Sequence, residues 1–296
     1  MIDRRERRAW ICRGLGAALL VALALLLAPS LIRLTRECAA MEENPQDLLP
    51  SMIYMTIKAK DILLGGVWTT VLMALFGTAI AFALSIFLLF LRIQEPGPRD
   101  PLATDLLKRC VCAFARFYVF VIRGTPMMVQ TLIFYYFGFS LFKRTGMTVT
   151  EIDRVWSAFA SGLFTVSLNS TAYLTEVLRA GIRGVDPGQM EAARSLGMTA
   201  WQAMRKVVFP QAVRNSIPAI GNEFIINIKD SSVLSVIGVM DLMYATRSVS
   251  GIYYRSLEIY CVAALLYLLL TWMSSLILGG ISRRLDLPVQ GIPSSN

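Results

Sequence analysis

Long apolar runs separated by short polar segments dominate the chain. A helix needs about 20 mostly apolar residues to cross the hydrocarbon core of a bilayer, and six runs approach that length. They cover residues 14–32, 62–91, 117–142, 155–180, 217–240 and 257–281. The second and sixth runs are nearly free of charge, whereas charged or turn residues interrupt the third and fifth. The pattern predicts an all-α fold, a polytopic transmembrane helical bundle.

The first run is open to two interpretations. A basic cluster, Arg4, Arg5, Arg7 and Arg8, precedes it, as in a secretory signal that is later removed. The apolar stretch is also long enough to span the bilayer as a retained anchor, at about 1.5 Å of rise per residue. We favour the anchor. Both interpretations place the residue that follows the run on the outer side.

The composition excludes a soluble domain and several kinds of chemistry. Only 17% of the residues are charged and 55% are hydrophobic, whereas a soluble domain carries about 25% charged residues. The chain has no histidine, the commonest acid/base group and metal ligand near neutral pH. Its five cysteines form no CxxC pair, so neither a zinc site nor a disulfide framework is indicated. We therefore expect no catalytic residues, no metal and no cofactor.

The distribution of basic residues along the chain is explained by its orientation in the membrane, and not by a nucleic-acid-binding surface. With the N-terminus inside, the inner segments 1–13, 92–116, 179–214 and 281–296 carry 18 of the 29 Lys and Arg residues. The outer segments 33–61, 143–156 and 241–256 carry nine. This excess obeys the positive-inside rule, and it predicts that both termini are cytoplasmic. A nucleic-acid partner is not needed to explain the net charge of +9.

The inner loop over residues 179–215 predicts a short helix that begins at Asp186. Asp186 is a suitable N-cap, Pro187 suits the first helical position, and Gln189 would complete a capping box. Gly197 suits the residue just past the end. The apolar positions on one face are Met190, Ala193 and Leu196.

A second short helix is predicted directly after the first. Thr199 with Gln202 repeats the capping-box pattern, and Pro210 is expected to end the helix. Its apolar positions are Trp201, Met204 and Val207 or Val208. Helices this short are not stable alone. Their apolar faces therefore pack either under the chain's own membrane helices or against another protein.

The run from Glu191 to Gly197 resembles the EAA loop of the permease subunits of bacterial ABC importers, in which EAA is followed by three residues and Gly. In that family the loop is a coupling helix that docks in a groove of a cytoplasmic ATPase. The resemblance assigns ATPase coupling to Glu191, Ala192, Ala193, Leu196 and Gly197.

Further segments, in the same order, resemble the polar amino-acid branch of that family. They are Arg123-Gly124-Thr125-Pro126 with Gln130, residues 169–179, 210–215, 221–224, 229–232 and 235–238. The resemblance covers about residues 62–285, which implies a type I importer permease domain of five helices with a coupling loop at 181–212. Residues 1–61 then add an N-terminal membrane helix and an outer loop, and residues 286–296 form a short cytoplasmic tail.

Polar residues inside the predicted spans are candidates for the substrate path, because ionisable groups are costly in the bilayer. Helical spacing places three of them on one face of the fourth run and three on one face of the fifth, with a lysine beside them. They are Asn169, Tyr173 and Glu176, then Glu223, Asn227 and Asp230, with Lys229. Carboxylates and a lysine suit a zwitterionic substrate. The alternative is that these groups fix helices against each other or against a second subunit.

A structural or gating role is expected for the polar residues of the third run. Gly124, Thr125 and Pro126 allow a break in the helix, and we expect Arg123 at the inner end of this span with Gln130 nearby.

Taken together, the residues and the resemblance predict a membrane permease for polar L-amino acids in the bacterial inner membrane, working by alternating access. The chain has no GxxxxGK[ST] loop, so ATP must be hydrolysed by another chain. The resemblance implies two ATPase subunits, a second permease subunit (the same chain or a sister chain), a periplasmic or surface binding protein and membrane lipid as partners. The alternative substrate is another small solute such as an opine. An intramembrane enzyme or an ion channel is disfavoured because neither GxSxG nor a filter-like motif is present.

Overall fold

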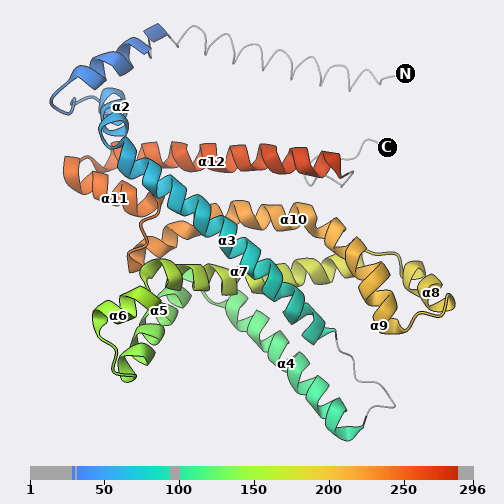
Figure 1. The fold of residues 1–296 in the computed structure, drawn as a ribbon. Helices are drawn as coiled ribbons and strands as arrows, with labels where there is room; N and C mark the ends of the chain where they lie inside the picture. The colour runs from blue at the N-terminus through green and yellow to red at the C-terminus, as the bar shows by residue number, and fades with distance from the viewer. Residues whose placement is uncertain (1–28, 31, 94–100, 286–296) are drawn as a thin grey trace, which may run out of the picture. The chain divides into compact units, whose positions relative to one another are not determined.

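The computed structural model describes residues 29–30, 32–93 and 101–285, and within them the backbone is helical with connecting turns and contains no strand (Figure 1). The all-α prediction is confirmed. Residues 32–40 are helical, and the helices that follow are α2 Leu48–Lys58, α3 Lys60–Arg92, α4 Leu102–Gly124, α5 Met127–Arg144, α6 Val149–Val155, α7 Ala158–Arg183, α8 Pro187–Ser195, α9 Ala200–Ala203, α10 Phe209–Asp230, α11 Leu242–Tyr253 and α12 Ser256–Arg284. A π-helical turn, Met204–Val208, joins α9 to α10, and a 3₁₀ turn, Ser231–Ile237, follows α10.

The chain divides into two compact units. One comprises Met1–Leu63 with Arg247–Val262, and the other comprises Leu64–Thr246 with Ala263–Asn296. In the first unit, Tyr54 of α2 packs edge-on against Tyr253 with ring centroids 6.0 Å apart. The predicted first span, residues 14–32, lies almost wholly outside the described residues.

Two helices in the described part of the chain are long and apolar enough to cross a membrane by themselves. They are α3 and α12, and their bounds match the second and sixth apolar runs closely. The fourth run is also a single helix, α7, which begins three residues later than expected. α7 and α10 do not meet the same apolar criterion, because Ser, Thr and Asn occupy many of their buried positions.

The third run consists of two helices with a sharp break between them, at the residues Gly124, Thr125 and Pro126 where the sequence allows a break. α4 and α5 meet at an angle of 112° at the two residues Thr125 and Pro126. α4 also begins well before the predicted span, at Leu102, where Pro101 stands in the N-cap position. Much of the segment predicted as an inner loop, residues 92–116, is therefore helix.

The predicted bounds of the fifth span are wrong at both ends. α10 begins at Phe209 rather than near residue 217, and it ends at Asp230, where the 3₁₀ turn replaces the predicted last part of the span. The prediction that Pro210 ends the second short helix is wrong. Pro210 stands in the first turn of α10 directly after the π turn, and the helical path continues through it.

The second unit is built around α7, which contacts α4, α5 and α10. α7 and α10 lie side by side in Figure 1. The two helices approach each other closely at Gly181, where a methyl group would lie 2.7 Å from the Ala212 carbonyl oxygen. Small residues at helix interfaces allow such close packing in membrane proteins. Because α7 and α10 pack together, their buried polar residues lie in the interior of the second unit.

Candidate functional site

The loop between α7 and α10, predicted to be a coupling loop, contains α8, which is capped by Asp186. The carboxylate of Asp186 accepts a hydrogen bond from the backbone N–H of Gly188 at 2.8 Å, and Pro187 occupies the first helical position. The predicted capping box with Gln189 is wrong. The Gln189 side-chain oxygen instead accepts a 3.4 Å bond from Gln211 on α10, because the fold brings that donor within reach.

α8 ends at Ser195 with Leu196 as its C-cap, and Gly197 is the residue just past the end, as predicted. Gly197 has a φ of +86°. Its N–H donates to the Arg194 carbonyl at 3.0 Å, and the N–H of Met198 donates to the Ala193 carbonyl at 3.2 Å. This pair of bonds is a Schellman motif, which satisfies carbonyls that the helix end leaves open.

The second helix of the loop begins as predicted and then continues into the membrane domain. The Thr199 N–H donates to the side chain of Gln202 at 2.9 Å, and the Gln202 N–H donates to the Thr199 hydroxyl at 3.2 Å. This capping box is confirmed. Because α9, the π turn and α10 follow one another without a gap, the loop is joined rigidly to α10.

One face of the loop packs under the chain's own helices. Val185, Val208 and Ala212 form a buried cluster, with Met190 and Met204 packed against it. Trp201 contacts the Phe90 ring at the end of α3, with centroids 5.3 Å apart. These contacts hold α8 and α9 in place without help from another protein.

The opposite face of α8 is open to a partner. Ala193 is buried, but Leu196 has 83% of its surface exposed. The predicted common face of Met190, Ala193 and Leu196 is therefore wrong at Leu196, which lies in the C-cap position where the chain turns away. Exposure is shared by Glu191, Ala192, Leu196 and Gly197. We call these four exposed residues the knob of α8; they comprise one acidic, one large apolar and two small residues.

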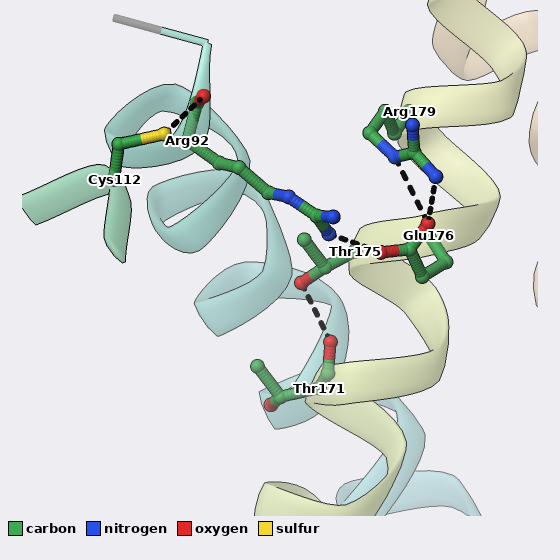
Figure 2. A network of polar contacts seen from close by, with 6 residues as sticks. All are labelled: Arg92, Cys112, Thr171, Thr175, Glu176 and Arg179. Atoms are coloured by element: carbon green, nitrogen blue, oxygen red, sulfur yellow. Dashed lines mark hydrogen bonds and ion pairs between the residues drawn. The ribbon is translucent and has the colours of Figure 1, made fainter. Parts of the chain in front are cut away.

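Glu176 of α7 lies in an ion network with two arginines (Figure 2). Arg92 reaches from the end of α3 to one carboxylate oxygen, and Arg179 donates from its Nε to the other at 2.9 Å. The three side chains are mostly buried, with 17–31% of their surface exposed. In this conformation the carboxylate is occupied by the protein's own cations.

The break between α4 and α5 is stabilised by Gln130. Its side-chain amide donates to the carbonyls of Ile122 at 2.7 Å and of Thr125 at 3.0 Å. Its oxygen accepts a 2.9 Å bond from Asn169 of α7. A broken helix in a membrane protein must find new partners for the carbonyls it frees. Gln130 is one such partner, and Asn169 holds it in position.

Arg123 lies in the last turn of α4, next to the same break. Its guanidinium stands over the ring of Tyr173, with 5.2 Å from Cζ to the ring centroid. Such a cation–π contact contributes about 0.5–1 kcal/mol when it is exposed. It places Tyr173 beside a cation on the exposed side of α7.

Asn227 joins three helices at the centre of the second unit. Its oxygen accepts from Ser170 of α7 at 3.0 Å, and its amide donates to Thr78 of α3 at 2.9 Å. Of its predicted neighbours on α10, Glu223 is buried, Asp230 is half-buried and Lys229 is exposed. The structure thus brings Asn169 and Asn227 into helix-joining contacts and leaves Lys229 at the surface.

Two arginines of the network were missed by sequence reasoning. Arg92 and Arg179 were counted only as inner positive charges, although both contact Glu176. Arg179 stands three residues after Glu176 on the same helix, which is a spacing that predicts contact. Arg92 is 84 residues away in sequence, and no local pattern could have paired it.

Comparisons with known proteins agree with this geometry. The family described as "Binding-protein-dependent transport system inner membrane component" matches residues 103–287. The chain is 32% identical over 227 residues to the nopaline transport system permease protein of Agrobacterium fabrum, covering 75% of this chain and 87% of that protein. It is 38% identical over 171 residues to the arginine transport system permease protein of Bacillus subtilis, covering 58% and 74% respectively.

Two solved structures have a similar fold. The crystal structure of an amino acid ABC transporter with histidines has a TM-score of 0.66 and 34% identity, covering 81% of this chain and 99% of that chain. The methionine ABC transporter in inward facing conformations has a TM-score of 0.57 and 21% identity, covering 76% and 97%. At 21% identity, the similarity to the methionine transporter is evidence for the fold only, and not for the substrate.

Proposed function

Since this chain belongs to the family of binding-protein-dependent transport system inner membrane components, we propose that it is the permease subunit of an ATP-driven importer for polar L-amino acids. The arginine permease relative and the amino acid transporter structure, at 38% and 34% identity, support this substrate class. An opine is the second candidate, because a nopaline permease is 32% identical over a longer alignment.

The observation that carries the coupling role is the exposed knob of α8. Leu196 stands in solvent at the tip of a loop whose other face is already packed against the membrane domain. The resemblance to the EAA loop assigns docking to this segment, and the exposure of Leu196 together with Glu191, Ala192 and Gly197 leaves the segment accessible to another protein. We propose that Glu191, Ala192, Leu196 and Gly197 enter a groove of a cytoplasmic ATPase, with Ala193 as the buried support beneath them.

The same proposal names the other partners and the orientation. The importer has two ATPase subunits that hydrolyse ATP, a second permease subunit and a binding protein that delivers substrate to the outer face. The chain itself catalyses no reaction. The loop between α7 and α10 and both termini lie on the cytoplasmic side of the inner membrane, in agreement with the excess of basic residues in those segments.

The substrate path is proposed along the polar sides of α7 and α10. Tyr173 and Glu176 line it on α7, and Glu223, Asp230 and Lys229 line it on α10. Because Arg92 and Arg179 hold Glu176 in this conformation, its carboxylate can accept a substrate ammonium group only after an arginine moves. Alternating access requires such a rearrangement. Asn169 and Asn227 set the positions of the helices that line the path.

Reconstitution tests the proposed function. The complex is purified through a tag on this chain, placed in proteoliposomes with its binding protein, and supplied with ATP inside and labelled arginine, glutamine, histidine or nopaline outside. We expect ATP-dependent uptake of at least one of the amino acids. Absence of an ATPase subunit from the purified complex would refute the coupling role, and uptake restricted to nopaline would replace the amino acid with an opine.

A further inference from the structure

A basic pocket of about 600 Å³ lies where α3, α4, α7 and the π turn meet. Four arginines line it: Arg92 at the end of α3, Arg116 on α4, and Arg179 and Arg183 in the last turns of α7. Met204 of the π turn forms another part of the wall. All of these residues belong to the second compact unit.

The pocket carries an excess of positive charge. Glu176 neutralises part of the charge on Arg92 and Arg179. Arg116 and Arg183 have no ion pair with any carboxylate in the described part of the chain. Four guanidinium groups against one carboxylate leave a formal surplus of three charges in one cavity. A concave, partly buried site focuses such a charge and attracts anions.

The chemistry of the lining favours a phosphate group. Guanidinium groups bind phosphate oxygens through paired N–H donors, and Arg116 on α4 and Arg183 on α7 both line the pocket without an ion pair among the described residues. A zwitterionic amino acid fits less well, because the carboxylate that would accept its ammonium group is already held by two arginines. The pocket is therefore matched to an anion without a cationic end.

The neighbouring surface indicates where that phosphate comes from. Phe114, Phe117 and Phe120 recur every three residues along α4, with Phe120 one turn after Arg116, and each phenylalanine has 63–75% of its surface exposed. Exposed aromatic rings next to a basic pocket suit a molecule with hydrocarbon chains and an anionic head. Basic pockets between membrane helices on the cytoplasmic side bind lipid headgroups by this combination.

We infer that the pocket binds the headgroup phosphate of an anionic phospholipid through Arg116 and Arg183, while the acyl chains lie along the exposed aromatic side of α4. Met204 lines the pocket and also packs against the cluster beneath α8. The bound headgroup thus contacts the base of the coupling loop. The inference goes beyond the transport function and does not depend on which solute is carried.

The test measures lipid retention by native mass spectrometry of the purified complex during stepwise exchange into detergent. The double variant Arg116→Gln/Arg183→Gln is compared with the unmodified complex, each loaded with phosphatidylglycerol, cardiolipin or phosphatidylcholine. We expect the double variant to bind the two anionic lipids at least about tenfold more weakly, because two charge-assisted hydrogen-bonding groups are lost. Phosphatidylcholine retention should not change.

Two controls separate a lost site from a damaged protein. Arg205→Gln removes one exposed arginine of the π turn that does not line the pocket, and it should leave lipid retention unchanged. Arg116→Lys/Arg183→Lys keeps the charge but not the paired donors, and it should bind at an intermediate level. Thermal stability and subunit stoichiometry are recorded for each variant, so that misfolding is recognised.

Three results would overturn the inference: equal retention of anionic lipid by the double variant, equal retention of phosphatidylcholine and phosphatidylglycerol by the unmodified complex, or displacement of the lipid by millimolar inorganic phosphate. The last would identify a site for soluble phosphate instead. If the double variant does not assemble, the lipid preference and the phosphate competition are still decided on the unmodified complex.

Discussion

Replacement of Gly197 by alanine tests how far the turn geometry of the coupling loop controls its function. Gly197 has a φ of +86°, and its ideal Cβ position has no atom within 4 Å. An alanine there meets no steric obstacle within the chain. The whole effect on the free subunit should come from the backbone, since an L-residue in the left-handed region costs about 1–2 kcal/mol.

The expected loss follows from the hydrogen bonds that this conformation supports. The Schellman motif joins Gly197 to Arg194 and Met198 to Ala193, and it aims the Leu196 side chain outward. A penalty of about 1–2 kcal/mol lowers the ratio of closed to frayed turn by about 5- to 30-fold. If the ATPase binds only the closed turn, its apparent affinity falls by up to that factor. The global stability changes little because the turn is local and exposed.

The assay is a titration of purified ATPase subunit onto the permease variants in detergent, with melting temperature and ATP-dependent uptake measured in parallel. Gly197→Asn is the first comparison, because asparagine tolerates the left-handed region better than alanine; it should bind more tightly than the alanine variant. Gly184→Ala is the matched control. That glycine ends α7 with a φ of −81°, and its Cβ would make only ordinary contacts at 3.5 Å or more.

Two outcomes would refute the reasoning. Unchanged ATPase affinity in Gly197→Ala would mean that the closed turn is not needed for docking. An equal loss in the alanine and asparagine variants would mean that the volume at this position, and not the backbone conformation, limits the approach of the ATPase.

Three further substitutions test other parts of the structure. Glu176→Gln should lower uptake and destabilise the complex by roughly 1–3 kcal/mol, because it leaves Arg92 and Arg179 without their counter-ion; unchanged melting temperature and uptake would contradict the importance of the network. Leu196→Glu should abolish ATPase co-purification with less than about 0.5 kcal/mol change in stability, since the side chain is exposed; retained ATPase would remove Leu196 from the docking surface. Gln130→Leu should destabilise the bend between α4 and α5 by about 2–3 kcal/mol, measured as a lower melting temperature, because two helix-end carbonyls lose their donor; an unchanged melting temperature would show that other groups satisfy the break.

The helix signals in the coupling loop could be predicted because they are local. Asp186, Gly197 and the pair Thr199–Gln202 each act through hydrogen bonds to residues two to five positions away. The residue types at those positions are therefore sufficient to predict them. The capping box predicted at Gln189 failed because its side chain accepts a hydrogen bond from Gln211 on α10. That donor is distant in sequence, so the local pattern does not reveal it.

The candidate substrate path could be predicted only as two helical faces. Spacing places Asn169 and Glu176 on one side of α7, but their roles depend on what the fold brings opposite. Asn169 meets Gln130 and becomes part of a helix break, whereas Glu176 meets Arg92 from another helix. Both contacts join residues 39 or more positions apart, so no sequence window contains them.

The amino-acid sequence by itself determined that this protein is an all-helical membrane component with two short capped helices between α7 and α10, because hydrophobic run length, charge balance and helix caps are properties of short segments. The sequence allowed a helix break at Gly124, Thr125 and Pro126, but only the tertiary structure decided its angle of 112°, the continuation of the loop into α10 through a π turn, and the pairing of Glu176. Each of these depends on which helices pack together. Packing is set by the whole chain, since the energy of a polar group inside the membrane domain depends on the partner that another segment supplies.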